Sequence, residues 1–170
     1  MGRKPAISEF PARDQTSWRQ VSVGVLVLLL GSLVYVLDRP PESVPFFDTI
    51  NFSHLVPNFF FPLGGNLPAF AHAFAFSLLT AAWLGGRRHH ALYACGFWFS
   101  VDCLFELGQH PVLAPQFSQL FPDHFDAISI LKHVEMYFVF GRFDNWDLVS
   151  IALGASTAYL FVLWTLRMDE

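Results

Sequence analysis

The sequence predicts an all-α membrane protein with four transmembrane helices and an interfacial amphipathic helix between the third and the fourth. Of its 170 residues, 54% are hydrophobic and only 14% are charged, against about 25% charged in a typical soluble domain. The charges also leave long gaps: 18 uncharged residues separate Arg19 from Asp38, and 19 separate Asp147 from Arg167. A helix needs about 20 apolar residues to cross the hydrocarbon core, so both gaps are long enough.

Composition and charge exclude several classes of protein. A net charge of −4 argues against a basic nucleic-acid binder, and two cysteines in 170 residues do not make a disulfide scaffold. So apolar a chain is not disordered. We therefore expect membrane lipids as partners, with other membrane protein subunits as a further class, and no nucleic acid.

The first helix is expected at about 19–37, in the first long gap between charges. A third gap, of 38 uncharged residues between Asp48 and Arg87, is interrupted in its first half by prolines and glycines. Because proline breaks helices, the second helix is expected only in the later part of this gap, at about 68–85.

The third helix is expected at about 91–107, a segment that is apolar except for Asp102 and Glu106 near its end. The fourth helix, at about 147–166, occupies the second long gap. Together the four helices form a transmembrane domain over 19–166, with a tail at 1–18 and a C-terminal end at 167–170.

Positive charge orients these helices, because Lys and Arg favour the cytoplasmic side of a membrane. Seven of them lie in the tails or in the short loop after the second helix, and three lie on the other side. Both termini are therefore expected in the cytoplasm. The alternative for the first helix is a cleaved signal peptide, but its apolar run exceeds the roughly 7–15 residues of a signal core and no A-x-A site follows.

Two long loops, about 38–67 and 108–146, then share the outer face. The second contains DHFDAISILKHVEMYFVF, in which Asp123, Asp126 and Ser129 alternate with apolar residues at helical spacing. This pattern fits an amphipathic helix that lies in the membrane interface. It fits equally a helix that packs over the mouth of the bundle, and the two interpretations are compatible.

Ionisable side chains inside a membrane are expensive, so those that occur there need a reason. Asp102, Glu106 and Gln109 are spaced at i, i+4 and i+7 and share one face of the third helix. With the topology above, six polar residues meet at the outer ends of three helices: His72, Asp102, Glu106, Gln109, Arg142 and Asp147.

This candidate cluster has structural alternatives. Asp147 can simply cap the fourth helix, where a carboxylate suits the positive end of the helix dipole, and Arg142 can snorkel to the interface. Asp102 is harder to explain in this way, because it lies about one turn further into the bilayer than Glu106. We therefore favour a buried, paired acid–base cluster.

No catalytic or metal-binding motif accompanies the cluster. The seven histidines include no H-x-x-x-H pair, so neither a metal nor a cofactor is expected. The chain also lacks a G-x-S-x-G elbow, a P-loop and a G-x-G-x-x-G loop. No nucleophile stands out, so no catalytic residue is assigned, and a binding protein is favoured over an enzyme.

Three short segments occur in the same order as the motifs of a known family. GNLPAFAHAFAFSLL opens the second helix with His72, FELGQ ends the third with Glu106, and GRFDNWDLVSIALGA introduces the fourth with Arg142 and Asp147. Over about residues 64–160 this order resembles the VanZ-like integral membrane proteins. That family carries a His, then E-x-x-Q, then G-R-x-x-x-x-D-x-x-x-N-x-x-G at the corresponding places.

The resemblance has three departures. Ile151 occupies the position of the family's Asn, and Leu67 and Pro68 stand where the family often has Asp-Lys before the His. In addition, 32 residues separate Gln109 from Arg142, where the family has a short connection. The chain therefore resembles a specialised member. What the resemblance implies is a multi-pass protein of the bacterial inner membrane with a role in the cell envelope, in a family named for a protein linked to teicoplanin resistance.

Two functional hypotheses follow. In the first, the protein binds or handles a lipid or lipid-linked head group at the outer leaflet. Arg142 would then meet a phosphate, as its fork of donors allows, and Asp147 would hold Arg142. In the second, the chain is a non-catalytic accessory subunit of a larger membrane complex, and the cluster only holds helices together.

Overall fold

The computed structural model describes residues 12–38, 52–53, 59–119, 138 and 141–168. All regular elements in these ranges are helices, so the all-α prediction is confirmed. They are α1 (Ala12–Leu37), η2 (Leu63–Gly65), α2 (Leu67–Trp83), α3 (Arg88–Gly108), α4 (Ala114–Ser118) and α6 (Asn145–Met168).

Three of the described helices are long and apolar enough to cross a membrane: Ser17–Leu37 within α1, α3 and α6. This is consistent with a multi-pass membrane protein. α2 is also apolar but has only 17 residues. It ends at Trp83, two residues before the predicted end, because Gly85 and Gly86 follow with positive φ angles of 94° and 64°, which glycine adopts without strain.

The other helices begin earlier than the sequence indicates. α1 begins at Ala12, inside the segment predicted as a cytoplasmic tail, and α3 begins at Arg88. α6 begins at Asn145, where the side chain of Asp144 accepts a hydrogen bond from the Trp146 backbone N–H at 2.9 Å. That contact is the geometry of a helix N-cap. Hydropathy marks the apolar part of a helix, whereas caps decide where it ends.

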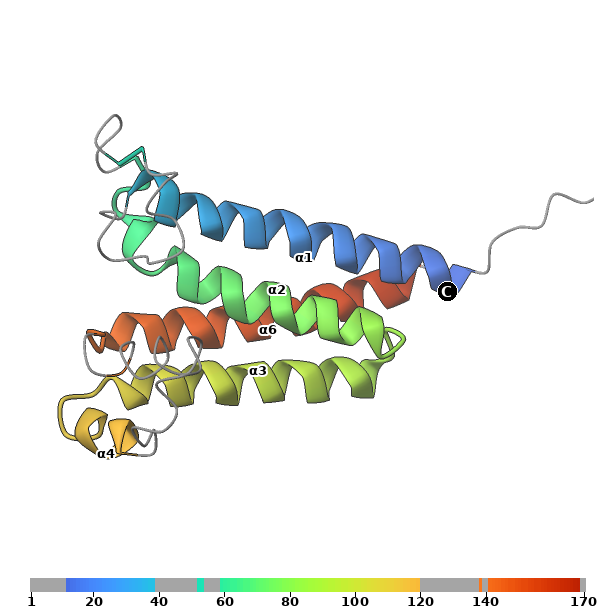
Figure 1. Cartoon of the computed structure of the whole chain (residues 1–170). Coiled ribbons are helices and arrows are strands. Elements are labelled where there is room, and N and C mark those ends of the chain that lie inside the picture. Colours follow the sequence, from blue (N-terminus) through green and yellow to red (C-terminus); the bar gives the residue numbers. More distant parts are fainter. Residues whose placement is uncertain (1–11, 39–51, 54–58, 120–137, 139–140, 169–170) are drawn as a thin grey trace, which may run out of the picture.

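α2 lies at the centre of the bundle and packs against α1, α3 and α6 (Figure 1). Its buried face is rich in alanine, and glycines of the neighbouring helices approach it closely. A Cβ on Gly31 would lie 2.7 Å from the Cβ of Ala71, and one on Gly154 would lie 2.5 Å from the carbonyl oxygen of Phe70. Small residues at helix contacts allow this close packing in membranes.

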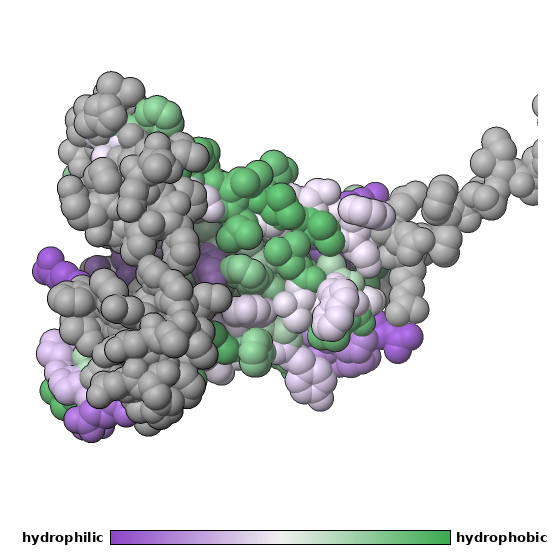
Figure 2. All heavy atoms as spheres, viewed as in Figure 1, coloured by the Kyte–Doolittle hydropathy of each residue, from purple (hydrophilic) through white to green (hydrophobic). Residues whose placement is uncertain are grey.

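The hydrophobic core is formed by α2, α3 and α6. Its buried members are Phe74, Leu78 and Ala81 of α2, Ala91, Ala94 and Cys95 of α3, and Ala155, Ala158 and Val162 of α6. Figure 2 shows hydrophobic side chains over the middle of the face in view, with hydrophilic ones towards the ends. This distribution suits a bundle whose middle lies in hydrocarbon.

Successive long helices of the chain run in opposite directions, so the bundle has two ends (Figure 1). One end, here the carboxylate end, holds the C-termini of α1 and α3 and the N-termini of α2 and α6. Its described acidic residues are Asp38, Asp102, Glu106, Asp144 and Asp147. The opposite end, here the arginine end, carries the exposed side chains of Arg19, Arg87, Arg88 and Arg167.

The predicted interfacial helix falls almost entirely outside the described residues. Of the loop 108–146, the structure describes α4, the buried Phe138 and the segment that leads into α6. The ring of Phe138 stacks on that of Phe105, with centroids 5.4 Å apart, and also packs against Gly108. This residue of the loop therefore covers the end of α3.

Candidate functional site

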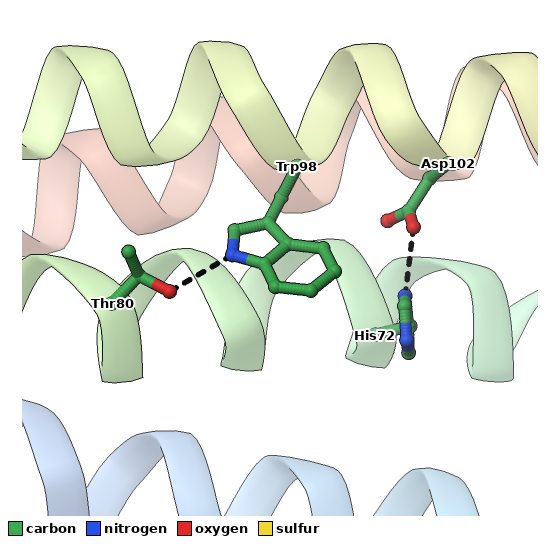
Figure 3. A network of polar contacts seen from close by, with 4 residues as sticks. All are labelled: His72, Thr80, Trp98 and Asp102. Atoms are coloured by element: carbon green, nitrogen blue, oxygen red, sulfur yellow. Dashed lines mark hydrogen bonds and ion pairs between the residues drawn. The ribbon is translucent and has the colours of Figure 1, made fainter.

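The centre of the candidate site is a pair formed by His72 of α2 and Asp102 of α3. His72 Nδ1 and Asp102 Oδ1 lie 2.8 Å apart (Figure 3). His72 lies five residues after the start of α2 and Asp102 six residues before the end of α3. At a rise of about 1.5 Å per residue, both are about 8–9 Å inside the carboxylate end. Antiparallel packing thus brings them to one level.

The two partners of this pair differ in exposure. The side chain of His72 is 45% exposed, whereas that of Asp102 is 8% exposed. Asp102 Oδ2 is buried and has no hydrogen-bond partner within the part of the chain that the structure describes. A buried carboxylate oxygen without a donor is unfavourable, so this atom has the capacity to accept a further hydrogen bond.

Aromatic side chains hold the imidazole in place. The ring of His72 packs against Phe76, with centroids 4.4 Å apart, and meets Trp98 edge-on at 5.8 Å. Trp98 Nε1 in turn donates a hydrogen bond to Thr80 Oγ1 at 2.9 Å (Figure 3). Two polar contacts therefore join α2 to α3. The Thr80–Trp98 contact lies deeper in the bundle than the His72–Asp102 pair.

Glu106 links the end of α3 to the start of α6. Its side chain is buried, and its Oε1 accepts a hydrogen bond from the backbone N–H of Asp144 at 2.7 Å. Its Oε2 accepts one from Gln109 Nε2 at 3.3 Å. A carboxylate that accepts a backbone N–H makes a charge-assisted bond, so Glu106 fixes the entry of the last helix.

Asp147 joins α6 to the start of α2. Its Oδ1 accepts a hydrogen bond from Asn66 Nδ2 at 2.8 Å. The N-cap contact of α6 is made by Asp144. Arg142 is exposed, and the expectation that Asp147 holds Arg142 stays a prediction.

The structure thus arranges five of the predicted residues in four polar contacts at the carboxylate end, and Arg142 is exposed. Asn66 and Asp144 were missed by the sequence reasoning. Asp144 had a signal, because an Asp three residues before another acidic residue, at the start of an apolar run, resembles a capping box. Asn66 had none, since it stands in an irregular stretch of prolines and glycines.

The chemistry available here is hydrogen bonding and proton exchange. Within the described ranges, no three His, Cys, Asp or Glu side chains come together as a metal site. The cluster offers carboxylate acceptors, an imidazole and, on the surface, a guanidinium. Such a set can recognise a polar group that carries both hydrogen-bond donors and an anion.

We compared the chain with protein-family models, with curated proteins and with solved structures. No family model, curated protein or solved structure matches it. The resemblance to the VanZ-like proteins therefore stays a prediction, and the residues and contacts described above carry the functional interpretation.

Proposed function

We propose that this protein binds the polar head group of a lipid or lipid-linked molecule at its carboxylate end. One observation carries the proposal: Asp102 keeps a buried, unpartnered carboxylate oxygen beside the half-exposed His72. Ionisable residues within transmembrane segments are rare and usually serve a function. A ligand that donates a hydrogen bond to this oxygen would satisfy it.

The head group is defined by the chemistry around it. A hydroxyl or ammonium group of the ligand donates to Asp102, and the exposed face of His72 contacts the same group. Arg142, exposed at the same end, binds the ligand's phosphate, because a guanidinium pairs with phosphate through two parallel bonds. Glu106 and Gln109 hold the loop that carries Arg142 against α3. These are binding roles, and no covalent step is assigned.

The proposal includes a position for this site at a leaflet surface, which the lengths of the helices support. α2 has 17 residues, within the range of about 17–25 that spans a bilayer, and it lies between three longer helices. We therefore propose four spans. The arginine end would face the cytoplasm by the positive-inside rule, so the carboxylate end would face the outer leaflet. The proposed setting is a VanZ-like protein of the bacterial inner membrane with a role in the cell envelope.

A second candidate is a non-catalytic accessory subunit of a membrane complex. It is favoured by the way His72–Asp102 and Thr80–Trp98 both join α2 to α3, because hydrogen bonds between transmembrane helices also serve as structural links. In this case the two contacts should be equivalent. Ligand binding, in contrast, distinguishes the pair at the carboxylate end from the one deeper in the bundle.

The test compares Asp102→Asn with Thr80→Val in the full-length protein. Each variant is reconstituted in nanodiscs made of a bacterial lipid extract. Native mass spectrometry reports the lipids that stay bound, and thermal unfolding reports stability. We expect Asp102→Asn to reduce retained head-group lipid at least tenfold, whereas Thr80→Val lowers stability but keeps the lipid.

Two results would contradict the proposal. If both variants lower stability to a similar degree and neither changes the bound lipid, the cluster is a structural link. If the wild-type protein retains no lipid but copurifies reproducibly with another membrane protein at fixed stoichiometry, the accessory subunit is supported instead.

A further inference from the structure

A groove lies at the arginine end, away from the cluster. It is a groove of about 520 Å³ between α1 and α6, lined by Trp18, Arg19, Ser22, Val23, Phe161 and Trp164. α1 and α6 have few contacts with each other, because α2 lies between them over most of their length. The groove forms where the two helices come together at this end.

The lining residues change with depth from polar and aromatic ones to apolar ones. Arg19 stands four residues before Val23 in α1, and the exposed Arg167 stands six residues after Phe161 in α6. At about 1.5 Å per residue, the basic groups lie about 6–9 Å nearer to water than the apolar floor. Trp18 and Trp164 lie towards the same aqueous end and are 69% and 55% exposed.

This order matches a membrane interface. Tryptophan is enriched at the level of the head groups, where its ring is half in water and half in lipid. Arg19 directly follows Trp18 in α1 and therefore lies at this level, where a basic side chain attracts anionic lipids. Val23 and Phe161 provide an apolar surface for an acyl chain below it. The groove therefore presents charge and aromatic rings at the level of the head group, and hydrocarbon below them.

A buried hydrogen bond fixes the walls of the groove. Gln20 Nε2 donates to Thr165 Oγ1 at 3.1 Å, and both side chains are fully buried. Each is the direct neighbour of a lining residue, Arg19 in α1 and Trp164 in α6. The spacing of the two walls is therefore set before any ligand arrives, and such preorganisation reduces the cost of binding.

We propose that this groove binds one anionic phospholipid from the leaflet that faces the arginine end. Its phosphate lies at Arg19, its glycerol region lies between Trp18 and Trp164, and one acyl chain lies along Val23 and Phe161. The choice of an anionic lipid follows from charge complementarity, since four arginines are exposed at this end. This site is independent of the head-group site at the carboxylate end.

The experiment measures quenching of tryptophan fluorescence by phospholipids with brominated acyl chains, in nanodiscs that contain the full-length protein. Brominated phosphatidylglycerol diluted in phosphatidylcholine is compared with brominated phosphatidylcholine diluted in phosphatidylglycerol. We expect the anionic lipid to associate more tightly. Arg19→Gln should weaken its relative association about fivefold, the effect of one basic residue near a membrane surface.

Matched variants separate a site from diffuse attraction. Arg87→Gln removes the same charge at the same end but outside the groove, and should leave the preference unchanged. Replacing both Trp18 and Trp164 by Phe should remove the lipid-specific quenching, whereas Trp83→Phe should not. Equal loss in Arg19→Gln and Arg87→Gln, or equal quenching by both lipids, would overturn the proposal. Both arginines are exposed, and thermal unfolding of each variant checks that the bundle stays folded.

Discussion

The two ends of the bundle join their helices with different chemistry. At the arginine end the buried polar side chains include the neutral pair Gln20 and Thr165, and the arginines whose burial the structure describes are exposed. At the carboxylate end two acids, Asp102 and Glu106, are themselves buried. The same chain thus shows that a neutral hydrogen bond is enough to connect two of its helices.

This difference indicates why the buried acids are informative. A charged side chain at the centre of a transmembrane helix costs about 2.5–3.5 kcal/mol on insertion scales, whereas a neutral bond between helices contributes about 0.6–2 kcal/mol. Buried acids are therefore a poor choice if they only connect helices. Among the residues whose burial the structure describes, the buried acids lie at the carboxylate end, which favours binding or proton exchange there.

The largest effect is expected when the link between α3 and α6 is removed. Glu106→Ala leaves the Asp144 backbone N–H without its acceptor, so we expect a loss of about 2–3 kcal/mol in the free energy of unfolding, the range of bonds to charged groups. Glu106→Gln keeps an acceptor and should lose about half as much. Denaturation in mild detergent measures the free energy of unfolding of both variants. Equal losses would show that the hydrogen bond to Asp144 does not contribute to stability.

A smaller effect is expected for the histidine of the pair. His72→Ala leaves Asp102 buried without its partner, and we expect a loss of about 2 kcal/mol, below the 3–5 kcal/mol of fully buried pairs because His72 is partly exposed. Adding Asp102→Leu to His72→Ala should recover most of this stability. A double-mutant cycle measures the coupling between the two residues. If the double variant recovers no stability, the buried charge of Asp102 is not what destabilises His72→Ala.

The bond between α2 and α6 should matter less. Asn66→Ala removes the donor to Asp147 Oδ1, and the carboxylate stays in contact with water because Asp147 is only half-buried. We expect a loss of about 1 kcal/mol, typical of a single net hydrogen bond. Thermal unfolding of the variant measures it. A loss as large as that of Glu106→Ala would mean that Asp147 is as strongly desolvated as Glu106.

The smallest effect is expected at the arginine end. Replacing Gln20 by Leu together with Thr165 by Val removes both partners of a neutral buried bond, so we expect a change within about 1 kcal/mol of zero. Replacing Gln20 alone should destabilise more, because Thr165 would then lose its donor. A large loss in the double variant would remove the contrast between the two ends.

Much of the site was predictable because its residues break a local rule. His72, Asp102 and Glu106 stand out as polar groups near the ends of apolar helices, and antiparallel helices bring such ends together. The individual partners were less predictable. The pairing of Asp147 with Asn66 was missed because Asn66 lies in a segment without helical periodicity, and Arg142 is not placed by any pattern in the sequence.

By itself, the sequence determined the helices and the two ends of the bundle. Hydropathy and the spacing of charges are local properties, and the partition of a segment into the membrane depends on them directly. Only the tertiary structure decided which polar groups meet. His72 and Asp102 are 30 residues apart, and Asn66 and Asp147 are 81 apart. Such contacts depend on how small residues set the distance and rotation of neighbouring helices, as Gly31 and Gly154 do against α2.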